Sequence, residues 1–161
     1  MKSVLRKVFL GMAVAVFAAS VSSVSAQSKN PGMGTWKLNV AKSKFSPGSA
    51  LKSLTAKFEP AGKGVKQTTE GITADGKTTA TEYTANYDGK DYPLKGSPIA
   101  DTVSLKRPNA LTTLRTDKKD GKVVVTYKRV VAKDGKTFTA VIKGVNAKGE
   151  PFNNFLVFEK Q

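Results

Sequence analysis

The chain has 161 residues, with 27 lysines and arginines against 12 aspartates and glutamates, which gives a formal net charge of +15. It contains no histidine and no cysteine. This composition excludes disulfides, histidine-based general base catalysis, Ser-His-Asp and Cys-His nucleophilic sites and the common zinc geometries. We therefore expect a protein that is not an enzyme, with no catalytic residues, no metal site and no cofactor.

The first 26 residues have the three parts of a secretory signal peptide. Lys2, Arg6 and Lys7 give a positively charged start, an apolar stretch of 12 residues follows, and a small-residue cleavage site ends at Ala26. Twelve apolar residues are too few to span a bilayer as a helix, which needs about 20. We expect cleavage after Ala26 and a mature chain in the periplasm or outside the cell, without a transmembrane segment.

The expected mature chain keeps 24 basic and 12 acidic residues, and this charge is compatible with several kinds of partner. A lysine-rich surface attracts anions, such as an acidic ligand or an anionic envelope surface. No block of five consecutive basic residues occurs, so the lysines also fit a solvated shell scattered over the surface. Export argues against nucleic acid as the partner, and the other interpretations remain open.

Residues 27–33 are expected to form a flexible N-terminus, followed by a single domain from 34 to 161. Alternate residues in this domain are often apolar, as with Leu54, Ala56 and Phe58, which is typical of a strand with one buried face. No convincing run has the 3.6-residue period of a helix. The stretches predicted as strands are 34–39, 52–60, 64–72, 77–87, 90–95, 101–107, 111–117, 122–132, 136–146 and 151–159.

The tripeptide Asp-Gly-Lys occurs four times, at 75–77, 88–90, 120–122 and 134–136. Asp-Gly favours the tight turns of β-hairpins because glycine accepts a positive φ. We therefore interpret the four aspartates as turn residues rather than catalytic acids. The short connections predict an all-β fold, an antiparallel up-and-down meander of about eight to ten strands. Closure into a barrel would remove its two exposed edges.

The first predicted strand carries GTWKLN at residues 34–39, with the chain's only tryptophan, Trp36. This sequence resembles the opening strand of the calycin superfamily, which comprises the lipocalins and the fatty-acid-binding proteins. With PFNN at 151–154, the chain also resembles a family of small exported bacterial proteins of uncharacterised function. The resemblance implies a lipocalin-like, calycin-type β-barrel in which Trp36 closes one end. A barrel of this size holds either a small ligand or a packed interior.

Two features depart from the calycin pattern. Lipocalins place an arginine on a late strand over the tryptophan, whereas the last predicted strand here has Lys160 and no arginine. Fatty-acid-binding proteins insert two helices between the first two strands, and residues 40–50 are too short for them. These departures leave open whether the barrel holds a ligand.

Arg129 is the most informative charged residue. Counting by two along 123–131 places Tyr127 and Arg129 on one face, where a guanidinium and a phenol could hold a carboxylate. The opposite face is also rich in valine, so Arg129 alternatively lies near a strand end with its charged group in water. The candidate ligand-binding residues are Arg129, Tyr127, Trp36, Tyr83 and Phe138.

Two functions are compatible with these observations. The first is an exported, soluble binding protein for a small hydrophobic or amphipathic ligand, with an anionic ligand as one option. The second is a non-enzymatic, envelope-associated β-domain with a filled core that acts through its basic surface. The aromatic candidates fit either function, since aromatic side chains often simply fill a core. A cavity inside the barrel would distinguish the two.

Overall fold

The computed structural model describes residues 30–48 and 51–161, and the expected signal peptide lies outside these residues. A short 3-10 helix, η1 (Val40–Lys42), follows the first strand. All ten predicted strands are present, with ends that differ from the prediction by no more than two residues. The strands are β1 (Gly34–Leu38), β2 (Leu51–Ala61), β3 (Gly64–Thr73), β4 (Thr78–Asn86), β5 (Tyr92–Lys95), β6 (Thr102–Asn109), β7 (Thr112–Lys119), β8 (Lys122–Val131), β9 (Thr137–Val145) and β10 (Pro151–Lys160).

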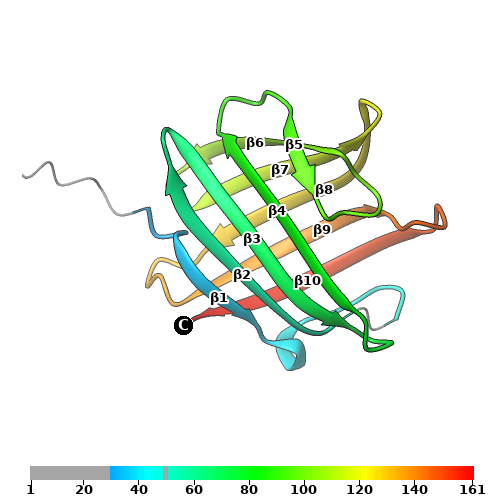
Figure 1. Ribbon diagram of the computed structural model, residues 1–161. Helices are drawn as coiled ribbons and strands as arrows, with labels where there is room; N and C mark the ends of the chain where they lie inside the picture. The colour runs from blue at the N-terminus through cyan, green and yellow to red at the C-terminus, as the bar shows by residue number, and fades with distance from the viewer. Residues whose placement is uncertain (1–29, 49–50) are drawn as a thin grey trace, which may run out of the picture.

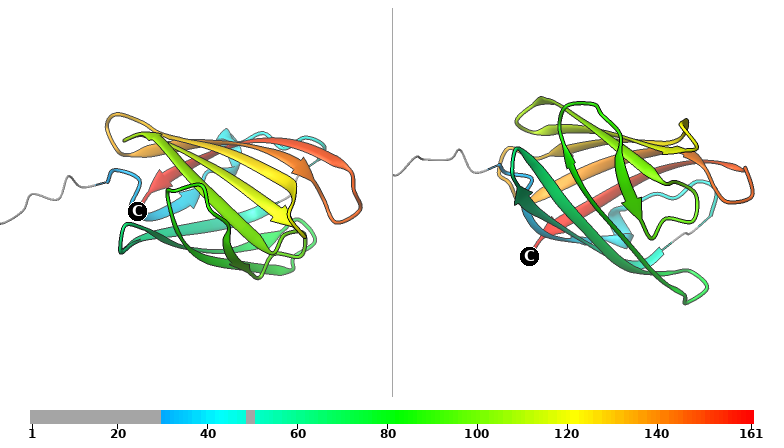
Figure 2. Two further views of the ribbon diagram at one scale, coloured as in Figure 1. Left: turned by 90° about the horizontal axis from the view of Figure 1, so that it is seen from above. Right: turned by 45° about the horizontal axis from the view of Figure 1, so that its top comes forward.

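The strands form one antiparallel sheet that closes on itself. Each strand pairs with its neighbours along the chain, and β1 pairs with both β2 and β10 (Figure 1, Figure 2). At the closure, Trp36 lies opposite Ala56 of β2 and opposite Lys160 of β10. The backbone groups of β1 therefore bond on both sides, so neither the first nor the last strand of the described meander is left as a free edge. This confirms the predicted all-β meander and its closure into a barrel.

The predicted turns also lie where they were expected. Glycine has a positive φ in each of the four Asp-Gly pairs, as tight turns require. A further glycine brings the chain close to the cavity described below. Gly96, after β5, has φ +77, and a Cβ there would collide with the Ala80 carbonyl oxygen of β4. Only glycine allows this approach, which leads directly into Ser97 beside the barrel interior.

Aromatic side chains fill the barrel interior near the start of β1. Trp36 is fully buried, and its ring lies edge-on to Phe138, with centroids 4.8 Å apart. Its indole Nε1–H donates a hydrogen bond to the Gly32 carbonyl oxygen at 3.3 Å. Lys160 Nζ lies 5.1 Å from the Trp36 ring centroid, within the range of a cation–π contact. Trp36 thus has the end-closing position that the GTWKLN motif predicts.

Residues 30–33 contact this same end of the barrel. Asn30 Oδ1 accepts a hydrogen bond from Arg107 Nη2 at 2.9 Å, and Met33 packs against the core. Gly32 approaches the interior closely, since a Cβ there would lie 3.0 Å from Arg129 Nη2. Within the described residues, contacts with the barrel are thus already present at Asn30, ahead of β1.

We expect Trp36→Ala to lower the free energy of unfolding by about 3–5 kcal/mol, because it leaves a cavity against Phe138. Trp36→Phe keeps an aromatic ring there but loses the hydrogen bond to Gly32, so we expect a loss of only about 1 kcal/mol from that bond. Urea unfolding followed by circular dichroism measures both values. An unchanged midpoint for Trp36→Ala would contradict the end-closing role.

Candidate ligand-binding cavity

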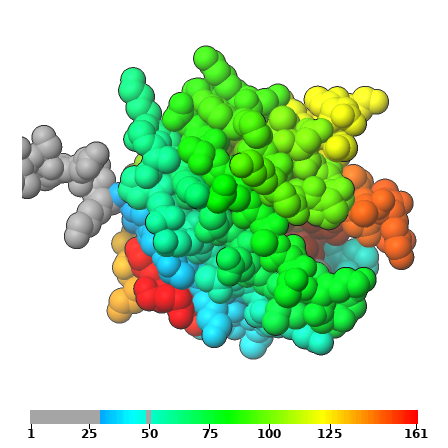
Figure 3. Space-filling model, viewed as in Figure 1, coloured from blue at the N-terminus to red at the C-terminus, as the bar shows by residue number. Residues whose placement is uncertain are grey.

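The barrel is not filled. Its interior encloses a cavity of about 300 Å³, at the lower end of the range of roughly 300–1,000 Å³ for small-molecule sites. The lining includes Ser97, between β5 and β6, and Phe152, at the start of β10. Figure 3 shows the surface hollowed between the β9–β10 turn (orange) and the green segments beside it. The structure therefore does not have the filled core that was expected for a domain acting through its basic surface.

The face of β8 that carries Tyr127 and Arg129 points into this cavity. Arg129 is only 9% exposed, so its charged group does not reach water at the strand end. That alternative is wrong because the apolar face decides the register of a strand in a barrel, and Val125 and Val131 share the buried face with Arg129. The Arg-Tyr pair thus lies inside.

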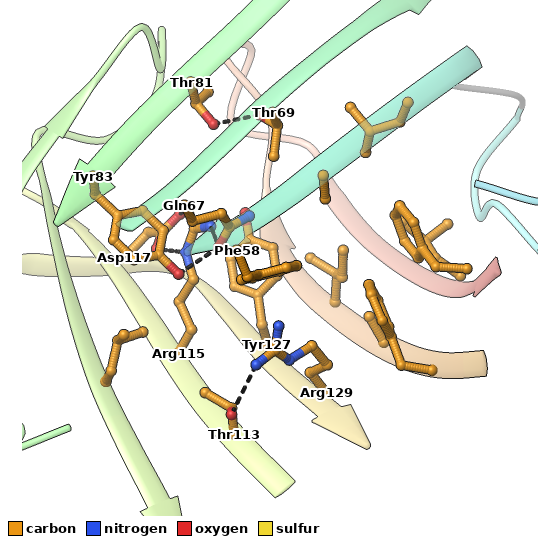
Figure 4. Close-up of a pocket in the computed structure, with 18 of the residues that line it drawn as sticks. Phe58, Gln67, Thr69, Thr81, Tyr83, Thr113, Arg115, Asp117, Tyr127 and Arg129 are labelled. Carbon is orange, nitrogen blue, oxygen red and sulfur yellow. Dashed lines mark hydrogen bonds and ion pairs between the residues drawn. The ribbon is translucent and has the colours of Figure 1, made fainter. Parts of the chain in front are cut away.

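Arg129 has apolar neighbours and an incomplete set of hydrogen bonds (Figure 4). Its Cζ lies 4.0 Å from the Phe58 ring centroid, and Nη2 donates to Thr113 Oγ1 at 3.2 Å. Nη1 is buried and has no hydrogen-bond partner within the described chain, and no described carboxylate forms an ion pair with this side chain. Burial accordingly lowers the pKa of Arg129 below its ordinary value.

The positive charge of the second interior arginine, Arg115, is balanced by a neighbouring carboxylate. Arg115 donates to both carboxylate oxygens of Asp117, from Nε at 2.6 Å and from Nη2 at 2.7 Å. Its Cζ also lies 4.8 Å from the Tyr83 ring centroid and 4.4 Å from that of Tyr127. Gln67 Oε1 accepts a hydrogen bond from Tyr83 and a longer one, at 3.5 Å, from Arg115 Nη1. This cluster holds one positive and one negative charge and is neutral overall.

The ionisation of the cluster follows from these contacts. Burial by itself opposes the charge on Arg115, but Tyr127, Tyr83 and Asp117 together raise its pKa above the ordinary value. Burial also raises the pKa of the Tyr83 and Tyr127 hydroxyls. Both phenols therefore stay neutral at physiological pH, where they can donate and accept hydrogen bonds.

A second unpaired polar atom lies in the same cavity. The Tyr87 hydroxyl is buried and, like Arg129 Nη1, has no partner in the described residues. Both side chains line the cavity. Buried polar groups in proteins are nearly always paired, so each unpaired one calls for an explanation. Polar groups bound in the cavity would supply the missing partners.

Comparison with known proteins identifies no family for this chain. No protein-family model matches the chain, and no curated protein matches it. Among solved structures, it is similar to zebrafish ileal bile acid-binding protein, which was crystallised with cholic acid. The two share 7% identity, with a TM-score of 0.48, over 81% of this chain and 99% of that one. At this identity we base no functional argument on the likeness.

Four of the five predicted binding residues line the cavity, namely Arg129, Tyr127, Tyr83 and Phe138. Trp36 is the exception, because it packs in the closed end and is not part of the cavity lining. Three other cavity residues, Gln67, Arg115 and Asp117, were not among the binding residues predicted from the sequence. Counting by two along the predicted strand 111–117 would have placed Arg115 and Asp117 on one face with Thr113.

The described residues contain no group of three or more acidic side chains that could hold a metal ion. No helix in the same part of the chain is long and apolar enough to cross a membrane. The cavity with its two arginines is therefore the candidate site on which the functional proposal rests.

Proposed function

We propose that this protein binds a small amphipathic monoanion, such as a monocarboxylate, inside the barrel. The observation that carries the proposal is Arg129, a buried guanidinium that lines the cavity without an anionic partner. Because Asp117 neutralises Arg115, the described interior carries one uncompensated positive charge. One bound carboxylate would neutralise it.

The cavity offers the carboxylate matching chemistry. An oxygen that accepts from Arg129 Nη1 would form a charge-assisted hydrogen bond, which is about twice as strong as a neutral one. The Tyr87 and Thr113 hydroxyls line the same cavity and supply further donors. The hydrocarbon part of the ligand would contact apolar side chains such as Phe58 and Leu156, and its removal from water supplies the remaining affinity.

The proposed role is binding rather than catalysis, and the proposed location is outside the cytoplasm. The only ionised pair inside the described barrel, Arg115–Asp117, is bonded internally, so neither group is available as an acid or base. The charged start, apolar stretch and small residues before Gln27 support export. Mass spectrometry of the protein from a secreting host should show a chain that begins at Gln27, and retention of Met1 in exported material would contradict this location.

Titration of the delipidated chain 27–161 with a fluorescent fatty acid tests the function. We expect saturable binding of one probe per protein, with displacement by dodecanoate and much weaker displacement by dodecylamine, which has the same chain and the opposite charge. A site inside the barrel should keep most of its affinity in high salt, whereas binding to surface lysines should collapse. Absence of saturable binding would contradict the proposal.

A further inference from the structure

The cavity has two chemically different walls. The first lies on the strands around β1, with β2 on one side and β10 and then β9 on the other, and its lining residues are all apolar except Asn154. The second consists of β3 to β8. Its lining residues on β3, β4, β7 and β8 are all polar or charged except Val65, and β6 adds Leu105. Because each set of strands is contiguous around the barrel, the two walls face each other across the cavity.

The polar wall extends well beyond the anion site at Arg129. Figure 4 shows the Thr69–Thr81 pair on the far side of the Gln67 cluster from Arg129. The two threonine hydroxyls bond to each other at 2.6 Å, and both line the cavity. The described hydrogen bonds of Gln67 use only its Oε1 atom, which leaves its NH₂ group for other partners. Hydrogen-bonding groups are therefore present along the ligand's length as well as at its anionic end.

A plain hydrocarbon chain matches only one of these walls. Apolar atoms laid against Gln67 or the threonines would take polar groups out of water without giving them a partner, which is unfavourable. Hydroxyl groups on one side of the ligand would bond to this wall, while the other side packed against residues such as Phe58, Phe138 and Leu156. The lining is thus complementary to a ligand that has two unlike sides.

We propose that the ligand is a monocarboxylate whose hydrocarbon frame carries hydroxyl groups along one side, and that Gln67 and the Thr69–Thr81 pair recognise them. This proposal rests on the function proposed above, because Arg129 fixes the carboxylate and thereby sets which side of the ligand meets which wall. In this proposal Arg129 selects for a negatively charged ligand, and the polar wall selects for hydroxyl groups on it.

The double variant Thr69→Val/Thr81→Val tests the proposal with little change of shape. It removes both partners of one hydrogen bond, so it leaves neither threonine unpaired, and such paired replacements can be nearly neutral for stability. Two probes are compared, 9,10-dihydroxystearate and stearate, which share chain length and charge and differ in two hydroxyl groups. Isothermal titration calorimetry gives the dissociation constant of each probe for the natural protein and for the variant.

The readout is the change in the ratio of the two dissociation constants from the natural protein to the variant. The difference in hydrophobicity between the probes enters both ratios equally, so it cancels in this comparison. We expect the variant to shift this ratio by about tenfold in favour of stearate, the effect of one or two lost hydrogen bonds. An unchanged ratio would overturn the inference while leaving the proposed function intact, since it would mean that water covers the polar wall. If neither acid bound the natural protein, the proposed function itself would fall.

Discussion

Replacement of Arg129 by methionine is expected to make the ligand-free protein more stable and the binding of carboxylates far weaker. The stability gain arises because Arg129 is a buried charge without an anionic partner. Methionine keeps a flexible apolar stem against Phe58 and removes the charge, which we expect to raise the free energy of unfolding by about 1–2 kcal/mol. Urea unfolding of the delipidated protein measures this gain.

The loss of affinity from Arg129→Met should be large because Arg115, the other arginine that lines the cavity, is already paired with Asp117, so the described interior then offers the anion no uncompensated cation. Removing one partner of a buried charge pair costs about 2–5 kcal/mol, so the dissociation constant of dodecanoate should rise by at least about 30-fold. Dodecanol, which has the same chain without a charge, should bind the variant at least as well as the natural protein.

Lys128→Met is the matched control for this experiment. Lys128 is adjacent on β8, its side chain is exposed, and its replacement changes the net charge by the same amount. We expect this control to change neither stability nor dodecanoate affinity appreciably. Equal losses of affinity in the two variants would show that the surface charge, and not the cavity, attracts the anion.

The strand pattern could be predicted from the sequence because it depends on local chemistry. Alternation placed Leu54, Ala56 and Phe58 on one face, and all three line the cavity. The Asp-Gly pairs located turns because a positive φ strongly favours glycine. Closure could be anticipated from the exposed edges of a long meander, although the pairing of β1 with β10 joins residues at opposite ends of the chain.

The candidate site was only partly predictable, because it depends on which distant side chains meet. A strand alone does not show which of its faces is buried, and this left Arg129 ambiguous between cavity and solvent. Asp117 neutralises Arg115 from the same strand, and the Tyr83 and Tyr127 rings of β4 and β8 pack against its guanidinium, so three strands build this cluster. The exclusion of Trp36 from the cavity likewise depends on its packing against Phe138 of β9.

Asp117→Asn is the second replacement from which we expect a large effect. It would raise the net charge of the described cavity residues from +1 to +2, because Arg115 would lose its partner. Asparagine has nearly the same shape as aspartate but cannot neutralise Arg115. The Arg115 and Asp117 side chains are only 11% and 3% exposed, so little solvent would replace the lost charge. Breaking a buried pair in this way lowers the free energy of unfolding by about 3–5 kcal/mol.

Removing both charges should reverse most of this loss. Buried ion pairs replaced together by apolar residues of similar volume are often neutral or stabilising, so Arg115→Met/Asp117→Leu should be more stable than Asp117→Asn. Thermal unfolding of the two variants tests this order. A double variant no more stable than the single one would mean that shape, rather than charge, holds this part of the barrel.

The charge argument also predicts a change of ligand preference. In the natural protein Arg129, the one uncompensated cation among the described cavity residues, favours dodecanoate over a dicarboxylate, whose second charge would be buried without a partner. In Asp117→Asn the uncompensated Arg115 supplies that partner, so one member of a chain-length series of α,ω-dicarboxylates should bind at least about tenfold more tightly than to the natural protein. The same dicarboxylate should raise the melting temperature of the variant, because it binds only the folded state. If no dicarboxylate gained affinity, Asp117 would not be the residue that limits this cavity to monoanions.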